Sequence, residues 1–145
     1  MEAEIIRPAP DDPLLASAAR RFRNVPAERA VEAARTFTVT PNTVAFVAAR
    51  EGEPLGWCWG HLLPRPDGVV TGRLDDLVVA EQHRGKGLGR ALVRAFMDEV
   101  SRQGAVKMSL TTGAHNAPAR ALYESLGGGL ASQGPTVNYW FLLDR

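Results

Sequence analysis

The chain has 145 residues, a common size for one domain, and its 17 basic and 16 acidic residues leave almost no net charge. This balance argues against a dedicated nucleic-acid binder, and the single cysteine, Cys58, excludes an internal disulfide and a cysteine-based metal site. No stretch approaches the roughly 20 apolar residues of a membrane span, and the acidic, proline-broken start is unlike a signal peptide. We therefore expect a single cytoplasmic domain over residues 1–145 that binds no metal, nucleic acid or membrane.

Strand and helix signals alternate along the chain. Runs rich in β-branched and aromatic residues predict strands, and apolar residues at helical spacing predict helices. We expect strands at 4–8, 43–50, 55–63, 69–80, 105–112 and 136–144. We expect helices at 13–23, 26–35, 87–102 and 116–126, the last one capped by Asn116. The turn EGEP joins two strands into a hairpin, and one helix lies between two strands as a parallel crossover, so the fold class is α/β (α+β) with a mixed sheet.

The segment RGKGLG, residues 84–89, places three glycines at the start of a helix, where glycine is unfavourable. A helix N-terminus exposes backbone N–H groups without internal partners and carries the positive end of the dipole, so a phosphate or pyrophosphate is its natural ligand. Arg84, Lys86 and Arg90 add positive charge. The G-x-G-x-G spacing fits neither the dinucleotide fingerprint nor the nucleotide-triphosphate loop. The alternative is a loop whose glycines merely permit tight packing of strand against helix.

In context, VVAEQHRGKGLGRAL resembles the acyl-coenzyme A loop of the GNAT N-acetyltransferase superfamily, with Arg84, Gly87 and Gly89 in its Q/R-x-x-G-x-G/A signature. The segment NAPARALYESLG resembles a later motif of that superfamily, in which Asn116 starts a helix and Tyr123 follows. A helix and a strand separate the two motifs, as the superfamily requires.

This resemblance, which covers roughly residues 43–127, implies the GNAT fold. That fold would be a mixed, mostly antiparallel sheet of six to seven strands with a splayed central parallel pair and about four helices. The chain departs from the pattern at Gly128, where many members have an aromatic or aliphatic residue. We expect this glycine to loosen the start of the next strand.

The resemblance also implies acetyl transfer from acetyl-coenzyme A, a cosubstrate, to an amine. The pyrophosphate would lie on the N–H groups of residues 85–90, and the pantetheine arm would pair with the strand edge near Leu77 and Val79. The residues implied to bind the cosubstrate are Leu77, Val78, Val79, Arg84, Gly85, Lys86, Gly87, Leu88, Gly89, Arg90, Asn116, Ala119 and Tyr123.

Three catalytic roles would complete the reaction. The Val79 N–H would stabilise the thioester oxygen, and Tyr123, at the family's usual position, would donate a proton to the leaving thiolate. For the base we consider Asp75 and Asp76, since charged residues are unusual in an apolar strand. The alternation of side chains along a strand would direct them to opposite faces. We favour Asp76 as the catalytic base and expect Asp75 to form an ion pair with a basic residue such as Arg73. Alternatively, both aspartates lie at the solvent-exposed end of the strand and have no catalytic role.

Two further side chains, those of His61 and Cys58, could have either a structural or a functional role. His61 ends a strand and could line the acceptor cleft, but we favour a hydrogen-bonded structural histidine. Cys58 could carry the acetyl group as a thioester, but between Trp57 and Trp59 in a strand it is typical of a buried core cysteine. We expect the two tryptophans, which share one face, to pack in the core.

Residues 62–89 look like the corresponding part of the aminoglycoside 3-N-acetyltransferases, which share an LP turn and the pair Asp76-Leu77. A polycationic acceptor needs an acidic cleft, to which we assign Asp75, Asp76 and Asp144. Other acceptors (a polyamine, an amino acid or a protein N-terminus) and a non-catalytic acyl-coenzyme A sensor stay open. A homodimer also stays open, because the apolar tail NYWFLL could pair across an interface or form a core strand.

Overall fold

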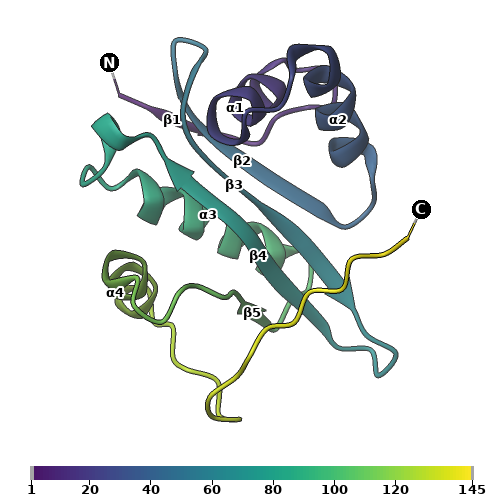
Figure 1. Cartoon of the computed structure of the whole chain (residues 1–145), viewed down its shortest axis with the longest axis vertical. Coiled ribbons are helices and arrows are strands. Elements are labelled where there is room, and N and C mark those ends of the chain that lie inside the picture. The colour runs from purple at the N-terminus through teal and green to yellow at the C-terminus, as the bar shows by residue number, and fades with distance from the viewer. Residues whose placement is uncertain (1, 145) are drawn as a thin grey trace. The chain divides into compact units, whose positions relative to one another are not determined.

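The computed structural model describes residues 2–144, which form two compact units that divide between Thr111 and Thr112 (Figure 1). The strands of the first unit are β1 (Glu4–Ile6), β2 (Thr43–Arg50), β3 (Glu53–Pro64), β4 (Val70–Val79) and β5 (Lys107–Ser109). Its helices are α1 (Leu14–Arg23), α2 (Ala27–Val39), the short 3-10 helix η1 (Glu81–His83) and α3 (Leu88–Arg102). The second unit contains α4 (Ala117–Ser125).

The five strands of the first unit form one sheet in the order β1-β2-β3-β4-β5. Strands β1 to β4 are antiparallel to their neighbours, whereas β4 and β5 run parallel and are connected through α3. The mixed sheet, the β2–β3 hairpin and the parallel crossover are thereby confirmed. The expectation of six to seven strands is corrected to five among the described residues.

The parallel pair separates early. β5 pairs with β4 only from Thr71 to Arg73, whereas β4 continues to Val79. Within residues 2–144, no strand lies along this later part of β4 on the β5 side. The backbone of β4 is therefore open along one edge, as a splayed pair implies, but the parallel pair lies at the edge of the five-stranded sheet and not at its centre as expected.

Residues 136–144, predicted as a last strand, contain neither strand nor helix. The large apolar residues of this segment are all exposed: Val137, Tyr139, Trp140, Phe141, Leu142 and Leu143. The prediction was wrong because the preference of aromatic and β-branched residues for strands reflects packing against neighbours on a pleated surface. Composition supplies the preference but not the neighbouring strand.

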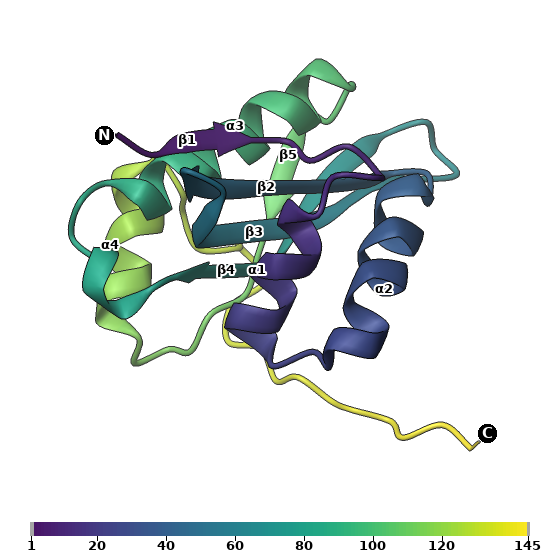
Figure 2. The same ribbon diagram turned by 90° about the horizontal axis from the view of Figure 1, so that it is seen from above.

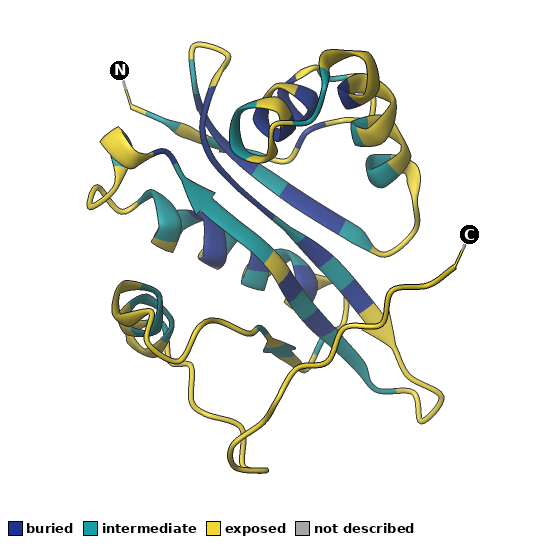
Figure 3. Ribbon diagram, viewed as in Figure 1, coloured by how far each residue is buried: buried dark blue, intermediate teal, exposed yellow. Residues whose placement is uncertain are grey.

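Helices cover both faces of the sheet (Figure 2), and Figure 3 shows that buried residues concentrate in β2, β3, α1 and α3. α1 and α2 pack on the face whose buried strand residues are Ala45, Val47, Ala49 and Trp57. α3 lies on the opposite face, where three glycines leave room for it. A Cβ built at Gly56, Gly60 or Gly72 would lie 3.2, 2.8 or 2.9 Å from Leu92, Phe96 or Val100 respectively.

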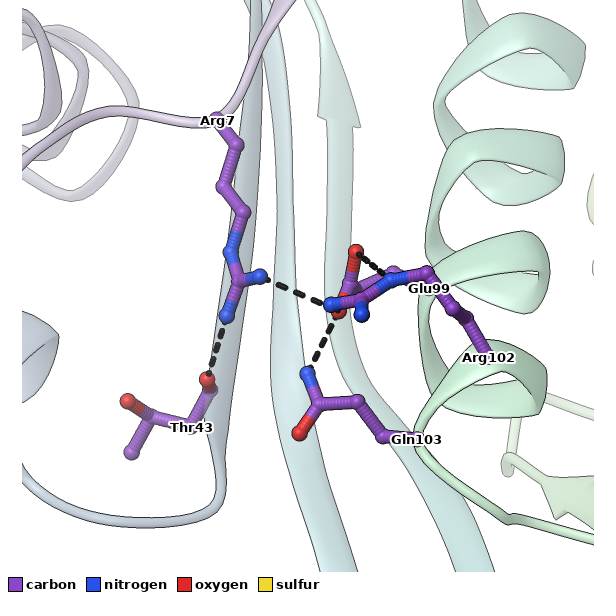
Figure 4. Close-up of polar contacts among 5 residues, drawn as sticks. All are labelled: Arg7, Thr43, Glu99, Arg102 and Gln103. Atoms are coloured by element: carbon purple, nitrogen blue, oxygen red, sulfur yellow. Dashed lines mark hydrogen bonds and ion pairs between the residues drawn. The ribbon is translucent and has the colours of Figure 1, made fainter.

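A carboxylate network fastens the segment after β1 to α3 (Figure 4). The side chain of Glu99 is 13% exposed and lies 3.1 Å from a guanidinium nitrogen of Arg7. It also accepts hydrogen bonds from Arg102 and Gln103, while Arg7 donates to the backbone carbonyl of Thr43 at 3.5 Å. Burial would raise the pKa of Glu99, but the hydrogen bonds from Arg102 and Gln103 and the charge of Arg7 hold it below its usual range. The network therefore depends on an ionised Glu99.

Candidate functional site

The start of α3 is open above two glycines in left-handed conformations. Gly85 has a φ of 76° and Gly87, the N-cap residue, has a φ of 85°. Nothing in residues 2–144 lies within 4 Å of a Cβ built at either position. If these glycines served only tight packing, neighbouring atoms would lie against them. The open space instead fits a ligand that approaches the backbone.

The first turn of α3 offers unused donors to such a ligand. Ala91 donates from its N–H to the carbonyl of Gly87 at 3.0 Å, so the N–H groups of Gly87, Leu88 and Gly89 precede the first intrahelical bond. No side chain caps the helix, and its first turn contains no acidic residue. The N-terminus can therefore hold an anion.

Positive charge collects beside this helix start. Partial burial and the positive charges of Lys86, Arg50 and Arg21 lower the pKa of His83, against an opposite effect of Glu53, which pairs with Arg21. Arg21 lies on α1 and Arg50 ends β2, so local sequence gives no signal that they approach residues 83–86. Together with the exposed Arg84 and Arg90 they form the surroundings that a polyanion requires.

Arg84 ties this loop to the end of β4. Its Nε donates to the backbone carbonyl of Val79 at 3.0 Å. Ala80 donates from its N–H to the carbonyl of Leu55 in β3 at 2.8 Å. Because backbone groups alternate along an antiparallel strand, Val78 also faces β3, whereas Leu77 and Val79 face the open edge. The Val79 N–H is therefore directed to the side where a pantetheine arm would pair.

A bulge at Asp75 interrupts the regular alternation of side chains along β4. Gly60 lies opposite Leu74 and Trp59 lies opposite Asp76, so Asp75 has no opposing residue on β3. Asp75 nevertheless contacts His61, two positions from Trp59 on the same face of β3. The expectation that Asp75 and Asp76 point to opposite faces was therefore wrong, because the inserted residue breaks the period of two.

Asp76 is firmly paired. One oxygen accepts from Arg23 Nε at 2.8 Å and from Trp57 Nε1 at 3.2 Å, and the other contacts a second nitrogen of Arg23. The hydrogen bond to Asp76 is the main cause of a raised pKa at Arg23. The side chain of Asp76 is only 12% exposed. The role of Asp76 as base stays a prediction, and in that role Arg23 must first give way.

Asp75 holds two other side chains. Its Oδ2 lies 2.7 Å from His61 Nδ1, and its Oδ1 lies 3.5 Å from Arg73 Nε, which confirms the expected pair with Arg73. The His61 ring makes edge contacts with Phe37 and Trp59, at centroid distances of 5.9 and 6.0 Å. Sequence reasoning had not linked His61 to Asp75, since fourteen positions separate them.

The remaining core predictions hold. Cys58 is 0% exposed, and burial raises the pKa of its thiol to about 12. Its Sγ lies 3.5 Å from the carbonyl oxygen of Leu92. Trp57 is buried in the core cluster and Trp59 packs against it. A buried, protonated thiol cannot serve as an acetyl carrier.

In the second unit, Asn116 caps α4 as predicted. Its Oδ1 accepts from the N–H of Ala119 at 3.2 Å, and a proline occupies the first turn. At the other end, Gly127 donates to the carbonyl of Glu124 at 3.0 Å and Gly128 to that of Tyr123 at 2.9 Å. This is a Schellman cap. A Cβ at Gly128 would lie 2.9 Å from the Tyr123 oxygen, so Gly128 closes the helix.

Tyr123 is half-buried on α4, and Asp144 is exposed in the irregular segment that follows. Within residues 2–144, no three His, Cys, Asp or Glu side chains gather where they could hold a metal ion. The described helices include none that is long and apolar enough to cross a membrane.

Comparison with known proteins relates the chain to acetyltransferases. A family model described as acetyltransferase (GNAT) family matches residues 13–128. The mycothiol acetyltransferase of Kocuria rhizophila is 35% identical over 86 residues, which cover 57% of this chain and 28% of that protein. A ribosomal-protein alanine N-acetyltransferase of Escherichia coli is 43% identical over 54 residues, or 37% of this chain and 36% of that protein. The chain thus matches well under half the length of these two relatives.

Among solved structures, an aminoglycoside acetyltransferase from a soil metagenome, in complex with sisomicin, aligns with a TM-score of 0.81. The alignment covers 98% of this chain and 97% of that one at 17% sequence identity. At this identity the likeness establishes a shared fold.

Proposed function

Because the chain belongs to the acetyltransferase (GNAT) family, we propose that it transfers an acetyl group from acetyl-coenzyme A to a small polycationic amine. The proposed acceptor is an aminoglycoside-like compound, acetylated at a 3-amino group. The observation that carries the acetyl-coenzyme A part is the open, positively charged start of α3.

The residues around α3 fit a diphosphate. The N–H groups of residues 85–90 would bind its oxygens, and Lys86 and Arg90 would add charge–charge attraction. The backbone of Leu77 and Val79 would pair with the pantetheine arm along the open edge of β4. Acetyl-coenzyme A, when bound, supplies the thioester carbonyl.

Two groups of the chain would then serve the transfer. The Val79 N–H would donate a hydrogen bond to the carbonyl oxygen as negative charge develops on it. Tyr123 would give a proton to the departing sulfur. Cys58 takes no part, because its pKa of about 12 keeps the buried thiol protonated, so transfer is direct.

The acceptor assignment rests on the face that carries both aspartates. Asp76 accepts a hydrogen bond from the Trp57 ring, and Asp75 contacts His61, whose ring packs against Phe37 and Trp59. Carboxylates next to aromatic faces suit an ammonium group. The related fold in complex with sisomicin supports the same class of acceptor, and Asp144 is a further proposed contact.

An assay of thiol release from acetyl-coenzyme A tests the proposal with sisomicin, spermidine and a peptide that begins with alanine. We expect turnover with sisomicin and a product acetylated on the 3-amino group, as read by NMR. Turnover with the peptide alone would mean that the acceptor is a protein N-terminus and not an aminoglycoside. The similarity to an alanine N-acetyltransferase favours this alternative. Tight coenzyme A binding without any turnover would indicate a sensor.

A further inference from the structure

His61 and Asp75 form a pair whose orientation fits proton transfer. The His61 Nδ1 lies 2.7 Å from Asp75 Oδ2. An ionised carboxylate only accepts hydrogen bonds, so Nδ1 must carry the hydrogen. In the neutral ring the lone pair then resides on Nε2, the nitrogen that can accept a proton.

The Nε2 atom is accessible. Within residues 2–144, the interactions of the His61 side chain are those with Asp75, Phe37 and Trp59, and no hydrogen bond of the protein involves Nε2. The His61 side chain is 37% exposed. A structural histidine of the core would have both nitrogens paired or buried, whereas this one directs only Nδ1 at the protein.

Both members of the pair are held in place. The Phe37 and Trp59 rings contact the His61 ring edge-on, at interplanar angles of 69° and 88°. Asp75 is the unpaired residue of the β4 bulge and is backed by Arg73, which also donates to Thr111 Oγ1 at 3.3 Å. Restrained groups lose little freedom when a substrate binds.

The pair also lies where β4 becomes available. His61 is opposite Arg73, the last residue of β4 that pairs with β5. The open edge of β4 begins just beyond Arg73 and extends to Leu77 and Val79 at the end of the strand. Asp76, the other candidate base, has both carboxylate oxygens engaged by Arg23.

We propose that His61 is the general base of the acetyl transfer and that Asp75 is its positioning residue, a step that rests on the proposed function. The acceptor ammonium gives a proton to Nε2, and the freed amine nitrogen forms a bond to the acetyl carbon. The carbon–sulfur bond breaks, and the sulfur takes its proton from Tyr123. The amide nitrogen gives up its second proton as the carbon–sulfur bond breaks, Tyr123 regains one proton from solvent, and the imidazolium releases one. The net products are therefore the amide, the free thiol and one proton.

Steady-state kinetics with acetyl-coenzyme A and sisomicin test this assignment. His61→Gln should lower kcat roughly 100-fold with a small change in KM, because it removes the base and keeps a polar side chain at the position. Added imidazole should restore part of the activity of His61→Ala. Asp98→Asn, an exposed carboxylate change on α3, is the matched control and should be neutral. A His61→Gln enzyme within threefold of wild type, with Asp76→Asn about 100-fold slower, overturns the proposal.

Nitrogen NMR of His61 gives a reading that does not depend on turnover. We expect hydrogen on Nδ1 and a lone pair on Nε2 in the wild type, and a mixture of the two tautomers in Asp75→Asn. Hydrogen fixed on Nε2 in the wild type overturns the proposal even if the enzyme is active. If no acceptor of the panel is acetylated, the proposed function fails, and this measurement still decides whether the pair is arranged for proton transfer.

Discussion

Arg84 Nε donates to the carbonyl oxygen of Val79 at 3.0 Å, so one side chain joins the glycine loop before α3 to the last residue of β4. The loop is the proposed diphosphate site, and the Val79 N–H is the proposed donor to the thioester oxygen. The two ends of the cosubstrate would therefore be positioned by parts of the chain that a single hydrogen bond holds together.

Replacing Arg84 should therefore affect both binding and rate. We expect Arg84→Ala to raise KM for acetyl-coenzyme A roughly tenfold and to lower kcat as well, since it removes a positive charge and a tether. Arg94→Ala, an exposed change of the same type on α3, should leave both constants near wild type. An unchanged kcat in Arg84→Ala would mean that the tether has no effect on Val79.

Gly87→Ala tests the open helix start. Alanine at φ 85° costs roughly 1 kcal/mol of stability, and its methyl group would fill the space proposed for the diphosphate. Gly68→Ala is a matched control, because Gly68 has a φ of 84° and equally open surroundings in the β3–β4 turn. Both variants should lose similar stability in thermal unfolding. Calorimetry should show weaker coenzyme A binding, by about tenfold or more, only for Gly87→Ala.

Tyr123→Phe should slow turnover about tenfold by removing the proton donor to the leaving sulfur. The KM for acetyl-coenzyme A should change little. Ser125→Ala, two positions further along the same short helix, serves as the comparison. If Tyr123→Phe retains full kcat, solvent supplies the proton and the assignment of Tyr123 is wrong.

Cys58 should be inert in the folded protein. A thiol with a pKa of about 12 and no exposed surface should not react with a disulfide reagent at pH 8, but it should react fully after unfolding in urea. Cys58→Ala should keep the wild-type kcat and lose about 1–2 kcal/mol of stability through a small cavity. Loss of activity without loss of structure would reopen a thioester route.

Glu99 should make stability depend on pH. Its pKa is lower in the folded chain than its ordinary value of 4.5, so it contributes stability that is present above that value and is lost as the pH falls through the folded pKa. Glu99→Gln should cost about 1 kcal/mol at pH 7 in urea unfolding. The difference from wild type should shrink well below pH 4. Glu32→Gln, an exposed change on α2, should show no such trend.

Local signals predicted most of the fold. The apolar stripe of α3, the cap at Asn116 and the EGEP hairpin are all encoded by residues close in sequence, and each is confirmed. The glycine loop was also identified from its own residues. The tail 136–144 was misassigned because a strand depends on a partner that no local pattern specifies.

The face of β4 that carries Asp75 and Asp76, proposed to bind the acceptor, was the least predictable part. One extra residue in β4 reversed the direction of Asp75, and an insertion of this kind has no sequence signature. Arg23 and His61 reach the aspartates from elements 53 and 14 positions away in the chain. Contacts at such separations follow from the packing of α1 and β3 against β4, so they become visible only in three dimensions.

Because Asp75 is the extra residue of the bulge, β4 could lose it without losing a partner on β3. A chain without it would regain an uninterrupted β3–β4 ladder, in which Leu74 and Asp76 keep Gly60 and Trp59 as their partners. The Val79 N–H and the Asp76 side chain would then keep their directions, and the carboxylate that contacts His61 would be lost. Relatives without this extra residue should therefore retain the backbone arrangement of β4 and lack the partner of His61, a difference that follows from one change in length.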